Sequence, residues 1–289
     1  MIKHSHCLIC SSPNLKVLPN FQKANLCKCG SCGFVFAQCI PTEQELIEYY
    51  DGYGRNDYLS PVTIKRYHEL LDKMEPYRKT NKLLDVGCGI GYFLEVAKER
   101  GWEVYGTEYT DKAIEICTGK GIEMHQGKLD PDNYAPESFD VITSFEVIEH
   151  INNPVEEIEN FKTLLRKGGI VYLTTPNFNS LLRHRLGERY DVITYPEHLS
   201  YYTPKTLKKL FCSHGFRKHR IQTTGISFTR LKTSKGETSQ AFISATSDDE
   251  HLRTKIEEKA YLQLAKKIVN GTLTLFGVGD SLKGWFVKR

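Results

Sequence analysis

Short apolar runs alternate with amphipathic stretches of helix length from Lys82 to the end of the chain. A continuous apolar run is typical of a strand buried on both faces, and a 3.6-residue repeat is typical of a helix. Strands that alternate with helices form mostly parallel sheets whose two faces are covered. The pattern therefore predicts an α/β fold of three layers around a doubly wound, mostly parallel, seven-stranded sheet. The expected strands are residues 83–86, 103–107, 122–125, 139–144, 170–174, 216–223 and 282–287, and the expected helices are residues 92–100, 111–118, 154–166, 204–213 and 252–269.

The same pattern divides the chain into three parts. Residues 1–40 form a cysteine-rich module, residues 41–80 a helical lid or linker, and residues 81–289 the domain that contains the sheet. Residues 230–272 are expected to be a loop and helix insertion before the last strand. Three tyrosines of the linker, Tyr49, Tyr50 and Tyr58, would cover a bound cation, since aromatic faces attract positive charge. An aromatic stripe on a helix is more often core packing, which we favour for at least half of these tyrosines.

Composition narrows the class of protein. The 289 residues are 40% hydrophobic and 26% charged, which is ordinary for a soluble globular chain. No run of 18 apolar residues exists, so we expect no transmembrane helix, and the N-terminus lacks the apolar core of a secretory signal. Nine cysteines, an odd number, favour metal binding or reduced thiols over a disulfide framework. We therefore expect a cytoplasmic protein.

Two cysteine pairs in the N-terminal part have the spacing of a zinc site. Cys7-x-x-Cys10 and Cys29-x-x-Cys32 are two knuckles, and thiolate pairs of this kind can hold a tetrahedral zinc ion. Cys27 competes with Cys29 as a ligand, and His4 or His6 could also compete. Four thiolates leave no open position for catalysis, so the predicted zinc is structural.

Residues 1–40 also carry the whole net charge of +4, because they contain four lysines and no acidic residue. The rest of the chain is balanced, with 39 − 4 = 35 basic and 35 acidic residues. Four thiolates on one Zn²⁺ would lower the total to about +2. This weak charge argues against nucleic acid as a partner and favours a small molecule.

A glycine-rich turn follows the first strand of the sheet domain. The segment Asp85-Val-Gly87-Cys88-Gly89-Ile-Gly91 connects a buried strand to a helix. Glycine is required where the backbone takes positive φ or approaches a ligand closely. Glu108 ends the next strand, where a carboxylate can accept both hydroxyls of a ribose. The spacing differs from the G-x-G-x-x-G of the nicotinamide cofactor sites.

These residues resemble the first motif of the class I S-adenosylmethionine-dependent methyltransferases. The resemblance continues through residues 104–109, 139–150, 164–177, 197–203 and 279–282, in the right order over about 200 residues. It implies the Rossmann-like methyltransferase fold, and it is closest to the ubiquinone-biosynthesis and sugar O-methyltransferases. The stretch from Cys29 to Ala37 resembles the small zinc module that precedes many bacterial sugar methyltransferases, in which Cys29 and Cys32 would be ligands.

The resemblance implies a set of residues that bind the cofactor. Many relatives place an Asp after the third strand to bind the adenine amino group, whereas this chain has Lys128 there. Adenine recognition would then use backbone groups near Lys128 and Leu129. Asp85 would either contact the cofactor or brace the loop. The implied cofactor-binding residues are Asp85, Gly87, Cys88, Gly89, Gly91, Glu108, Tyr109, Lys128, Leu129, Phe145 and Glu146.

The acceptor side has two features that could remove a proton from a hydroxyl. His198, within Pro196-Glu197-His198, is the first choice for a general base, because imidazole titrates near neutral pH. Glu149 and His150 belong to a Glu146-x-x-Glu149-His150 segment whose side chains would share one helical face. Glu146, Glu149, His150 and His198 could together hold a divalent metal, an arrangement similar to the site of small-RNA 3′-terminal 2′-O-methyltransferases. Alternatively, Glu149 and His150 are a structural pair and His198 braces its loop.

The sequence thus predicts an enzyme that transfers a methyl group from S-adenosylmethionine to a small-molecule acceptor, a hydroxyl of a sugar or related metabolite. One rival is a metal-assisted methyltransferase of the 3′ end of RNA. A second rival is a non-catalytic protein that binds the cofactor and recruits a partner. The intact glycine turn, Glu108 and the acceptor-side residues argue against this second rival.

Overall fold

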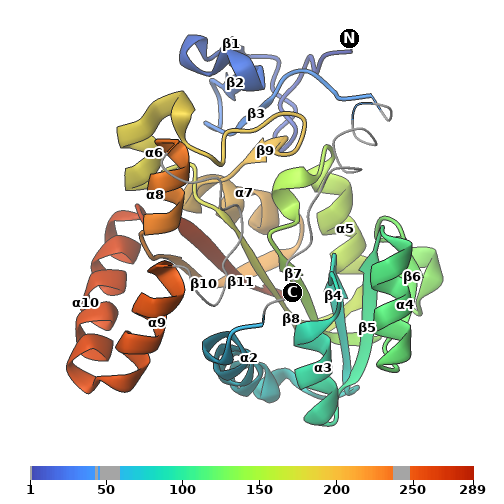
Figure 1. Ribbon diagram of the computed structural model, residues 1–289. Coiled ribbons are helices and arrows are strands. Elements are labelled where there is room, and N and C mark those ends of the chain that lie inside the picture. Colours follow the sequence, from blue (N-terminus) through green and yellow to red (C-terminus); the bar gives the residue numbers. More distant parts are fainter. Residues whose placement is uncertain (1, 43–44, 46–58, 237–247) are drawn as a thin grey trace.

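The computed structural model describes residues 2–42, 45, 59–236 and 248–289 (Figure 1). The predicted lid tyrosines Tyr49, Tyr50 and Tyr58 lie outside the described residues. No helix in the part of the chain that the structure describes is both long and apolar enough to cross a lipid bilayer.

The central sheet has seven strands in the order β10-β11-β8-β7-β4-β5-β6. The five strands from β8 to β6 pair in parallel, while β11 is antiparallel to both of its neighbours. This confirms the predicted mostly parallel sheet. The strands are β4 (Lys82–Val86), β5 (Glu103–Glu108), β6 (Glu123–Gln126), β7 (Phe139–Phe145), β8 (Leu165–Pro176), β10 (Phe216–Thr224) and β11 (Ser281–Lys288).

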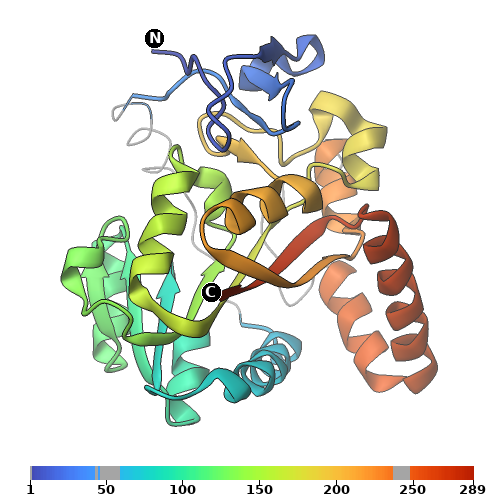
Figure 2. The ribbon, with the colours of Figure 1, turned by 180° about the vertical axis from the view of Figure 1, so that it is seen from behind.

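Helices cover both faces of the sheet and make three layers (Figures 1 and 2). On one face α2 (Pro61–Met74), α3 (Tyr92–Glu99) and α4 (Asp111–Gly119) pack on residues such as Val141, Tyr172 and Trp285. On the other face α5 (Pro154–Leu164) and α7 (Pro204–Ser213) pack on the alternate residues of the same strands, including Ile142 and Leu173. The two-residue alternation of side chains along each strand produces these two cores.

Two helix boundaries differ from the prediction. The helix expected at residues 154–166 ends at Leu164, because Leu165 is extended and pairs with Phe139 at the start of β8. Gly168, expected to stop the helix, lies inside β8 with φ +77°. The single helix expected at 252–269 is two helices, α9 (Asp248–Glu258) and α10 (Ala260–Phe276), interrupted by the extended Lys259.

The insertion contains more helix than expected. Residues 230–250 are expected to be a polar loop, but α8 (Phe228–Ser234) extends into this segment. Its N-cap is Ser227, whose hydroxyl accepts a hydrogen bond from the Arg230 amide. N-capping by serine stabilises even a short helix. Outside the insertion, a further short helix, α6 (Leu181–Leu186), follows β8.

The cysteine-rich part forms a second, four-stranded sheet in the order β1-β2-β3-β9. Its first three strands are β1 (Leu15–Val17), β2 (Leu26–Cys29) and β3 (Val35–Ala37). The fourth, β9 (Ser200–Tyr201), comes from the sheet domain and pairs antiparallel with β3. The N-terminal module is therefore joined by backbone hydrogen bonds to a loop more than 160 residues later, directly after His198.

Candidate functional site

The glycine turn between β4 and α3 has the backbone conformation that only glycine adopts easily. Gly87, Gly89 and Gly91 have φ of +69°, +55° and +76°. A Cβ at Gly87 would meet Val147 at 2.5 Å, and a Cβ at Gly91 would meet Ile122 at 2.7 Å. A Cβ at Gly89 would have no atom within 4 Å. Gly87 and Gly91 are thus required by packing, whereas Gly89 faces open space at the carboxyl edge of the sheet, where ligands bind in this fold class.

Glu108 lies at the end of β5, beside the turn. Its Oε2 accepts a hydrogen bond of 3.0 Å from the Gly89 amide, and its Oε1 accepts one of 2.8 Å from the Tyr109 amide. Both carboxylate oxygens are therefore held at the surface that Gly89 exposes. At this position the Glu108 oxygens can accept hydrogen bonds from the hydroxyls of a ribose, the role predicted for Glu108.

Asp85 is buried at the end of β4, and its Oδ1 accepts a 2.7 Å hydrogen bond from the Thr143 hydroxyl. Burial raises the pKa of the Asp85 carboxyl to about 7; the Thr143 hydrogen bond opposes this rise and the charge of Glu108 adds to it. The unfolded chain has the ordinary value near 3.8. Since the folded state holds this proton more tightly, stability contributed by Asp85 is present below pH 3.8 and is lost as pH rises toward 7.

We expect Asp85→Asn to stabilise the ligand-free protein at pH 8, by at most about 4 kcal/mol, and to change stability little at pH 4. Asparagine keeps the oxygen that accepts from Thr143 but carries no charge to desolvate. Urea unfolding of both proteins at the two pH values measures the difference. An equal effect of the substitution at pH 4 and pH 8 would show that Asp85 is not held at a raised pKa.

The residues predicted to flank the adenine differ in exposure and in partners. Tyr109 is 69% exposed beside Glu108, and Leu129 is 2% exposed. Lys128 forms an exposed ion pair with Glu156 at 3.3 Å. The Cys88 thiol packs inward against Met124 Sδ at 3.9 Å, so a contribution of Cys88 to ligand binding would come from its backbone.

Phe145 ends β7 on the α3 face. Its ring lies 5.1 Å from the ring of Phe93 and 5.7 Å from that of Tyr172, measured between centroids. Glu146 follows with φ +54°, a conformation that a non-glycine residue rarely adopts. Such strain is often found where a side chain must be aimed into a site.

Three of the four predicted acceptor-side residues come together. Donor atoms of Glu149, His150 and His198 all lie within 4.8 Å of one another, and Glu146 is not in this group. The expectation that Glu146 joins them is therefore not met, because its left-handed backbone turns the chain before the short helix at Ile148–His150. The imidazole rings of His150 and His198 are 4.8 Å apart.

Hydrogen bonds orient each member of this trio. Nδ1 of His198 lies 2.7 Å from the Val192 carbonyl, so it donates and Nε2 carries the lone pair. Nδ1 of His150 lies 2.9 Å from the Glu197 carbonyl. The buried Glu149 accepts a 2.9 Å hydrogen bond from the Thr175 hydroxyl. A cavity of about 10 Å³ touches Glu149 and His198, enough for about one water-sized occupant.

Burial determines the charge of the trio. Burial, with the positive form of His150 as the next cause, lowers the pKa of His198 to about 4. Burial likewise lowers the pKa of His150 and raises that of Glu149, where the charge of Glu146 adds to the rise. Both imidazoles are thus neutral near pH 7. Neutral imidazoles held by backbone carbonyls, next to a carboxyl group that would lose its proton on binding a cation, are a donor set that suits a divalent metal.

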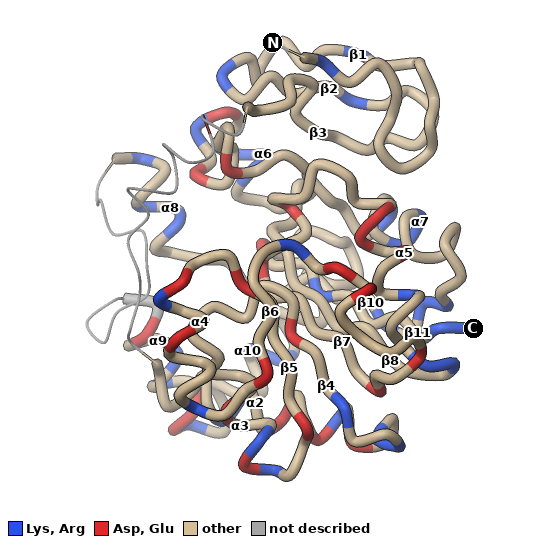
Figure 3. Tube along the Cα trace, turned by 90° about the vertical axis from the view of Figure 1, so that its right-hand side faces the viewer, with Lys and Arg blue, Asp and Glu red and all other residues tan. Residues whose placement is uncertain are grey.

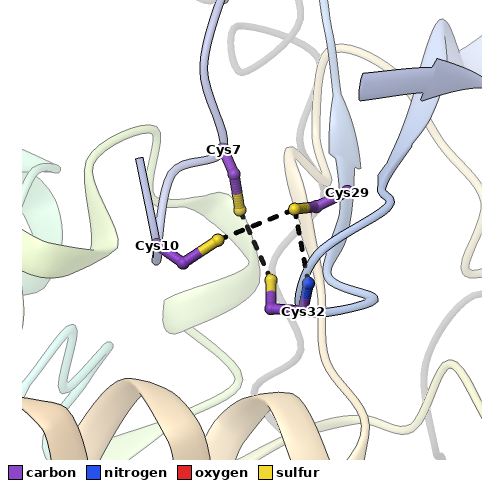
Figure 4. A group of neighbouring side chains, drawn as sticks. All are labelled: Cys7, Cys10, Cys29 and Cys32. Atoms are coloured by element: carbon purple, nitrogen blue, oxygen red, sulfur yellow. Dashed lines mark hydrogen bonds between the residues drawn. The ribbon is translucent and has the colours of Figure 1, made fainter. Parts of the chain in front are cut away.

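The four predicted zinc ligands converge from two loops of the N-terminal module (Figure 4). Sγ atoms of Cys7 and Cys32 are 3.5 Å apart, those of Cys10 and Cys29 are 3.6 Å apart, and all four lie within 4.8 Å. Thiolates about 2.3 Å from a tetrahedral zinc would be about 3.8 Å apart, so the set fits the ion. Cys27 is fully buried in β2 and lies outside this group, so the geometry favours Cys29.

Backbone amides also prepare one thiol for metal binding. Burial raises the pKa of the Cys29 thiol, but hydrogen bonds from the Cys32 and Ser31 amides outweigh it, so the pKa ends below its ordinary value. The Cys32 amide lies 3.5 Å from the Cys29 sulfur. A thiol that ionises easily is a better metal ligand.

The cysteine module holds the loop that carries His198. The Ala37 amide donates to the Leu199 carbonyl at 2.8 Å, and the Leu199 amide donates to the Glu149 carbonyl at 2.8 Å. His4 Nε2 lies 2.7 Å from the Asn152 side-chain oxygen. These contacts connect the module to both segments of the trio.

The sequence reasoning missed a polar cluster beside the trio. Tyr190, Asp191, Arg230 and Asp280 each have a buried side-chain atom without a hydrogen-bond partner among the described residues. Burial lowers the pKa of Arg230, but Tyr190, Glu146 and Asp191 outweigh it and raise the pKa. Tyr190 and Asp191 follow the short 3-10 helix Gly187–Arg189, Arg230 lies in α8, and Asp280 directly precedes β11, so no local sequence pattern connects them.

The chain is similar to known methyltransferases. A family model described as a methyltransferase domain matches residues 57–221, more than half of the chain. The ubiquinone biosynthesis O-methyltransferase of Nitrosomonas europaea is 28% identical over 202 residues, which are 65% of this chain and 84% of the relative. The enzyme of the same name from Leptothrix cholodnii is 29% identical over 148 residues, which are 48% of this chain and 61% of the relative.

A solved structure shares the fold. The S-adenosylmethionine-dependent methyltransferase of Archaeoglobus fulgidus aligns with a TM-score of 0.50 and 19% identity, over 86% of this chain and all of that one. The chain spans less than two thirds of the Leptothrix relative. None of these matches covers the whole of this chain.

Proposed function

The chain belongs to the class I S-adenosylmethionine-dependent methyltransferases, and from this membership we propose that it transfers a methyl group to a hydroxyl of a small molecule, a sugar or related metabolite. The curated relatives named above are O-methyltransferases. One observation carries the proposal: the glycine turn after β4, Glu108 at the end of β5, Glu149 and His150 after β7, and His198 in the segment after β8 all belong to the carboxyl edge of the sheet.

The proposed donor site uses the turn at Gly87, Gly89 and Gly91 for close approach of the backbone. Glu108 would hold the ribose hydroxyls, with Asp85 bracing the turn and Tyr109 and the backbone of Lys128 and Leu129 flanking the adenine. Phe145 and Glu146 would lie beside the methionine part. Methyl transfer is an in-line displacement, so the main contribution of these residues is alignment.

On the acceptor side, His198 is proposed to accept the hydroxyl proton at Nε2, since its Nδ1 already donates to Val192. In the alternative form of the proposal, Glu149, His150 and His198 hold a divalent ion, which when bound would lower the pKa of an acceptor hydroxyl. Nε2 of His198 would then be a metal ligand and would not accept the proton. Zinc held by Cys7, Cys10, Cys29 and Cys32 is proposed as structural, because its four protein ligands leave no open position.

The described surface gives little support to the RNA rival. Figure 3 shows Lys and Arg interspersed with Asp and Glu over the sheet domain in that view. The chain carries a net charge of +4 before any zinc is bound. Affinity for nucleic acid comes mainly from phosphate contacts to clustered cations.

We expect the protein to methylate a hydroxyl of free or nucleotide-linked sugars, and His198→Ala to lower kcat by about 100- to 10,000-fold because the proton acceptor is lost. Transfer of labelled methyl from S-adenosylmethionine to a sugar panel and to an RNA oligonucleotide measures both. His214→Ala, at a partly buried histidine paired with Glu159, should keep full activity. Methylation of RNA but of no sugar, or full activity of His198→Ala, would reject this assignment.

A further inference from the structure

Helix α10 exposes its apolar side chains and turns polar ones toward the protein. It lies at the edge of the molecule, next to α9, in both ribbon views (Figures 1 and 2). A surface helix of a monomeric protein has the opposite orientation, with its apolar stripe on the core. Six large apolar side chains of this one helix are between 51% and 79% exposed, namely Tyr261, Leu264, Ile268, Val269, Leu275 and Phe276.

Hydrogen bonds to β10 and to the turn after it fix this orientation. The Thr223 hydroxyl donates to the Leu273 carbonyl at 2.7 Å, and the Thr274 hydroxyl donates to the Thr223 carbonyl at 2.9 Å. The Asn270 side-chain oxygen accepts from the Gly225 amide at 2.9 Å. Leu273, on this inner side of the helix, is 5% exposed. The helix could not turn its apolar side chains inward without breaking these bonds.

The exposed residues of α10 form a stripe whose spacing is symmetric about Ile268. At about 100° per residue, the stripe covers about 80° of the helix circumference. Its members lie at the centre and at four and seven residues on either side of it, and this outer stripe consists of Tyr261, Leu264, Ile268, Thr272 and Leu275. Two small exposed residues, Ala265 and Gly271, flank it three residues from the centre, where they leave room for a second helix to approach closely.

An antiparallel pair of α10 helices around a two-fold axis at Ile268 would match the outer stripe with itself. Tyr261 would face Leu275 of the partner subunit. Leu264 would face Thr272 of the partner subunit, and the two Ile268 side chains would meet at the axis. This self-complementarity is what a two-fold interface requires. Antiparallel packing also brings the positive end of each helix dipole beside the negative end of the other.

The exposed apolar area of α10 is sufficient for a stable contact. Whole side chains of these types have about 150–200 Å² of surface, so the six exposed ones leave on the order of 700 Å² on one protomer. A standard interface buries about 800 Å² per partner. The largest apolar patch on a typical monomer is about 300–600 Å². The 17 residues of α10 give a contact about 25 Å long.

The charges around the outer stripe favour a protein partner over a lipid surface. Helices that lie on membranes carry several lysines and arginines on their polar face. The basic residues of α10 are Lys266 and Lys267, and Lys266 is paired with Glu257 of α9 at 3.0 Å. The neighbouring α9 has five acidic and two basic residues in its sequence. Anionic lipid would gain little attraction from this pair of helices.

We propose that two copies of this chain form a homodimer through α10, packed antiparallel about Ile268. Each copy would cover the apolar stripe of the other and remove it from water, which is the driving force for the pairing. The inference is independent of the methyltransferase proposal, because no residue of the outer stripe belongs to the proposed donor or acceptor site.

Sedimentation velocity of the full chain measures the pairing, and we expect a dimer at about 10 μM protein. Ile268→Glu would bring two carboxylates together at the axis and should raise the dissociation constant of the dimer by about 100-fold or more. Val17→Glu is the matched control, because Val17 is 63% exposed and Ile268 62%, but Val17 lies on β1 of the cysteine module. This control should remain dimeric, and circular dichroism should show the same helix content in both variants.

Cross-linking tests the antiparallel register without placing a charge on the face. Tyr261→Cys and Leu275→Cys proteins are mixed and treated with oxidised glutathione. We expect a disulfide-linked dimer in the mixture and in neither protein alone, because identical positions would be about 21 Å apart along the helix pair. The unmodified protein, treated in the same way, measures linking by the native thiols.

Three results would overturn the proposal. The first is an unmodified protein that stays monomeric at all concentrations, and the second is Ile268→Glu protein that dimerises as well as the unmodified chain. The third is cross-linking in each cysteine variant alone but not in the mixture. A monomer that sediments with vesicles of phosphatidylglycerol and phosphatidylcholine, and loses this binding in Ile268→Glu, would assign the face to a lipid surface instead.

Discussion

Cys29→Ser is expected to remove zinc from the protein and to lower methyl transfer at least 100-fold, although Cys29 belongs to a separate sheet from the donor site. Zinc binding to small thiolate modules contributes about 10–16 kcal/mol to their folding. Loss of one of four thiolates would leave the module without this contribution. Since β3 pairs with β9, and the Ala37 amide binds the Leu199 carbonyl, an unfolded module would release the loop of His198.

Cys27→Ser is the matched control for this prediction. Cys27 is buried in the same strand but lies outside the quartet, so this variant should keep about one zinc per chain and most of its activity. Elemental analysis and a methyl-transfer assay measure the two effects, and S-adenosylhomocysteine affinity should change little in either variant. Zinc retained in Cys29→Ser, or lost in Cys27→Ser, would show that the quartet is wrongly assigned.

Gly89→Ala is expected to lower S-adenosylhomocysteine affinity by about 30-fold or more, equivalent to about 2 kcal/mol of binding free energy. Gly89 has φ +55° and its added Cβ would meet no protein atom, so a methyl group there would occupy the space proposed for the cofactor. The positive φ alone would cost about 1–2 kcal/mol of folding stability.

Gly236→Ala separates these two effects. Gly236 has φ +74°, and its added Cβ would also meet nothing within 4 Å, but it lies after α8 and outside the proposed donor site. Both variants should lose similar stability in urea unfolding, and only Gly89→Ala should lose affinity. Equal affinity in the two variants would mean that the turn does not approach the ligand.

The sequence allowed prediction of the features that depend on local patterns. The strands of the large sheet follow from continuous apolar runs, and the glycine turn follows from three glycines that all need positive φ. The cysteine quartet follows from two short knuckles. The end of α5 was misjudged because pairing of Leu165 with Phe139 outweighed the local helix pattern.

Features that depend on distant residues could not be predicted in this way. The two-residue strand β9 is defined only by its pairing with Val35 and Phe36. The polar cluster around Arg230 likewise joins three segments that are far apart in the chain.

The most direct test of the central claim is calorimetric titration of the unmodified protein with S-adenosylhomocysteine, with Glu108→Ala in parallel. The proposed function predicts one site per chain and an affinity at least tenfold weaker in the variant, because Glu108 offers both carboxylate oxygens beside Gly89. Absence of binding to the unmodified protein, or equal binding to both proteins, would contradict the proposed cofactor site.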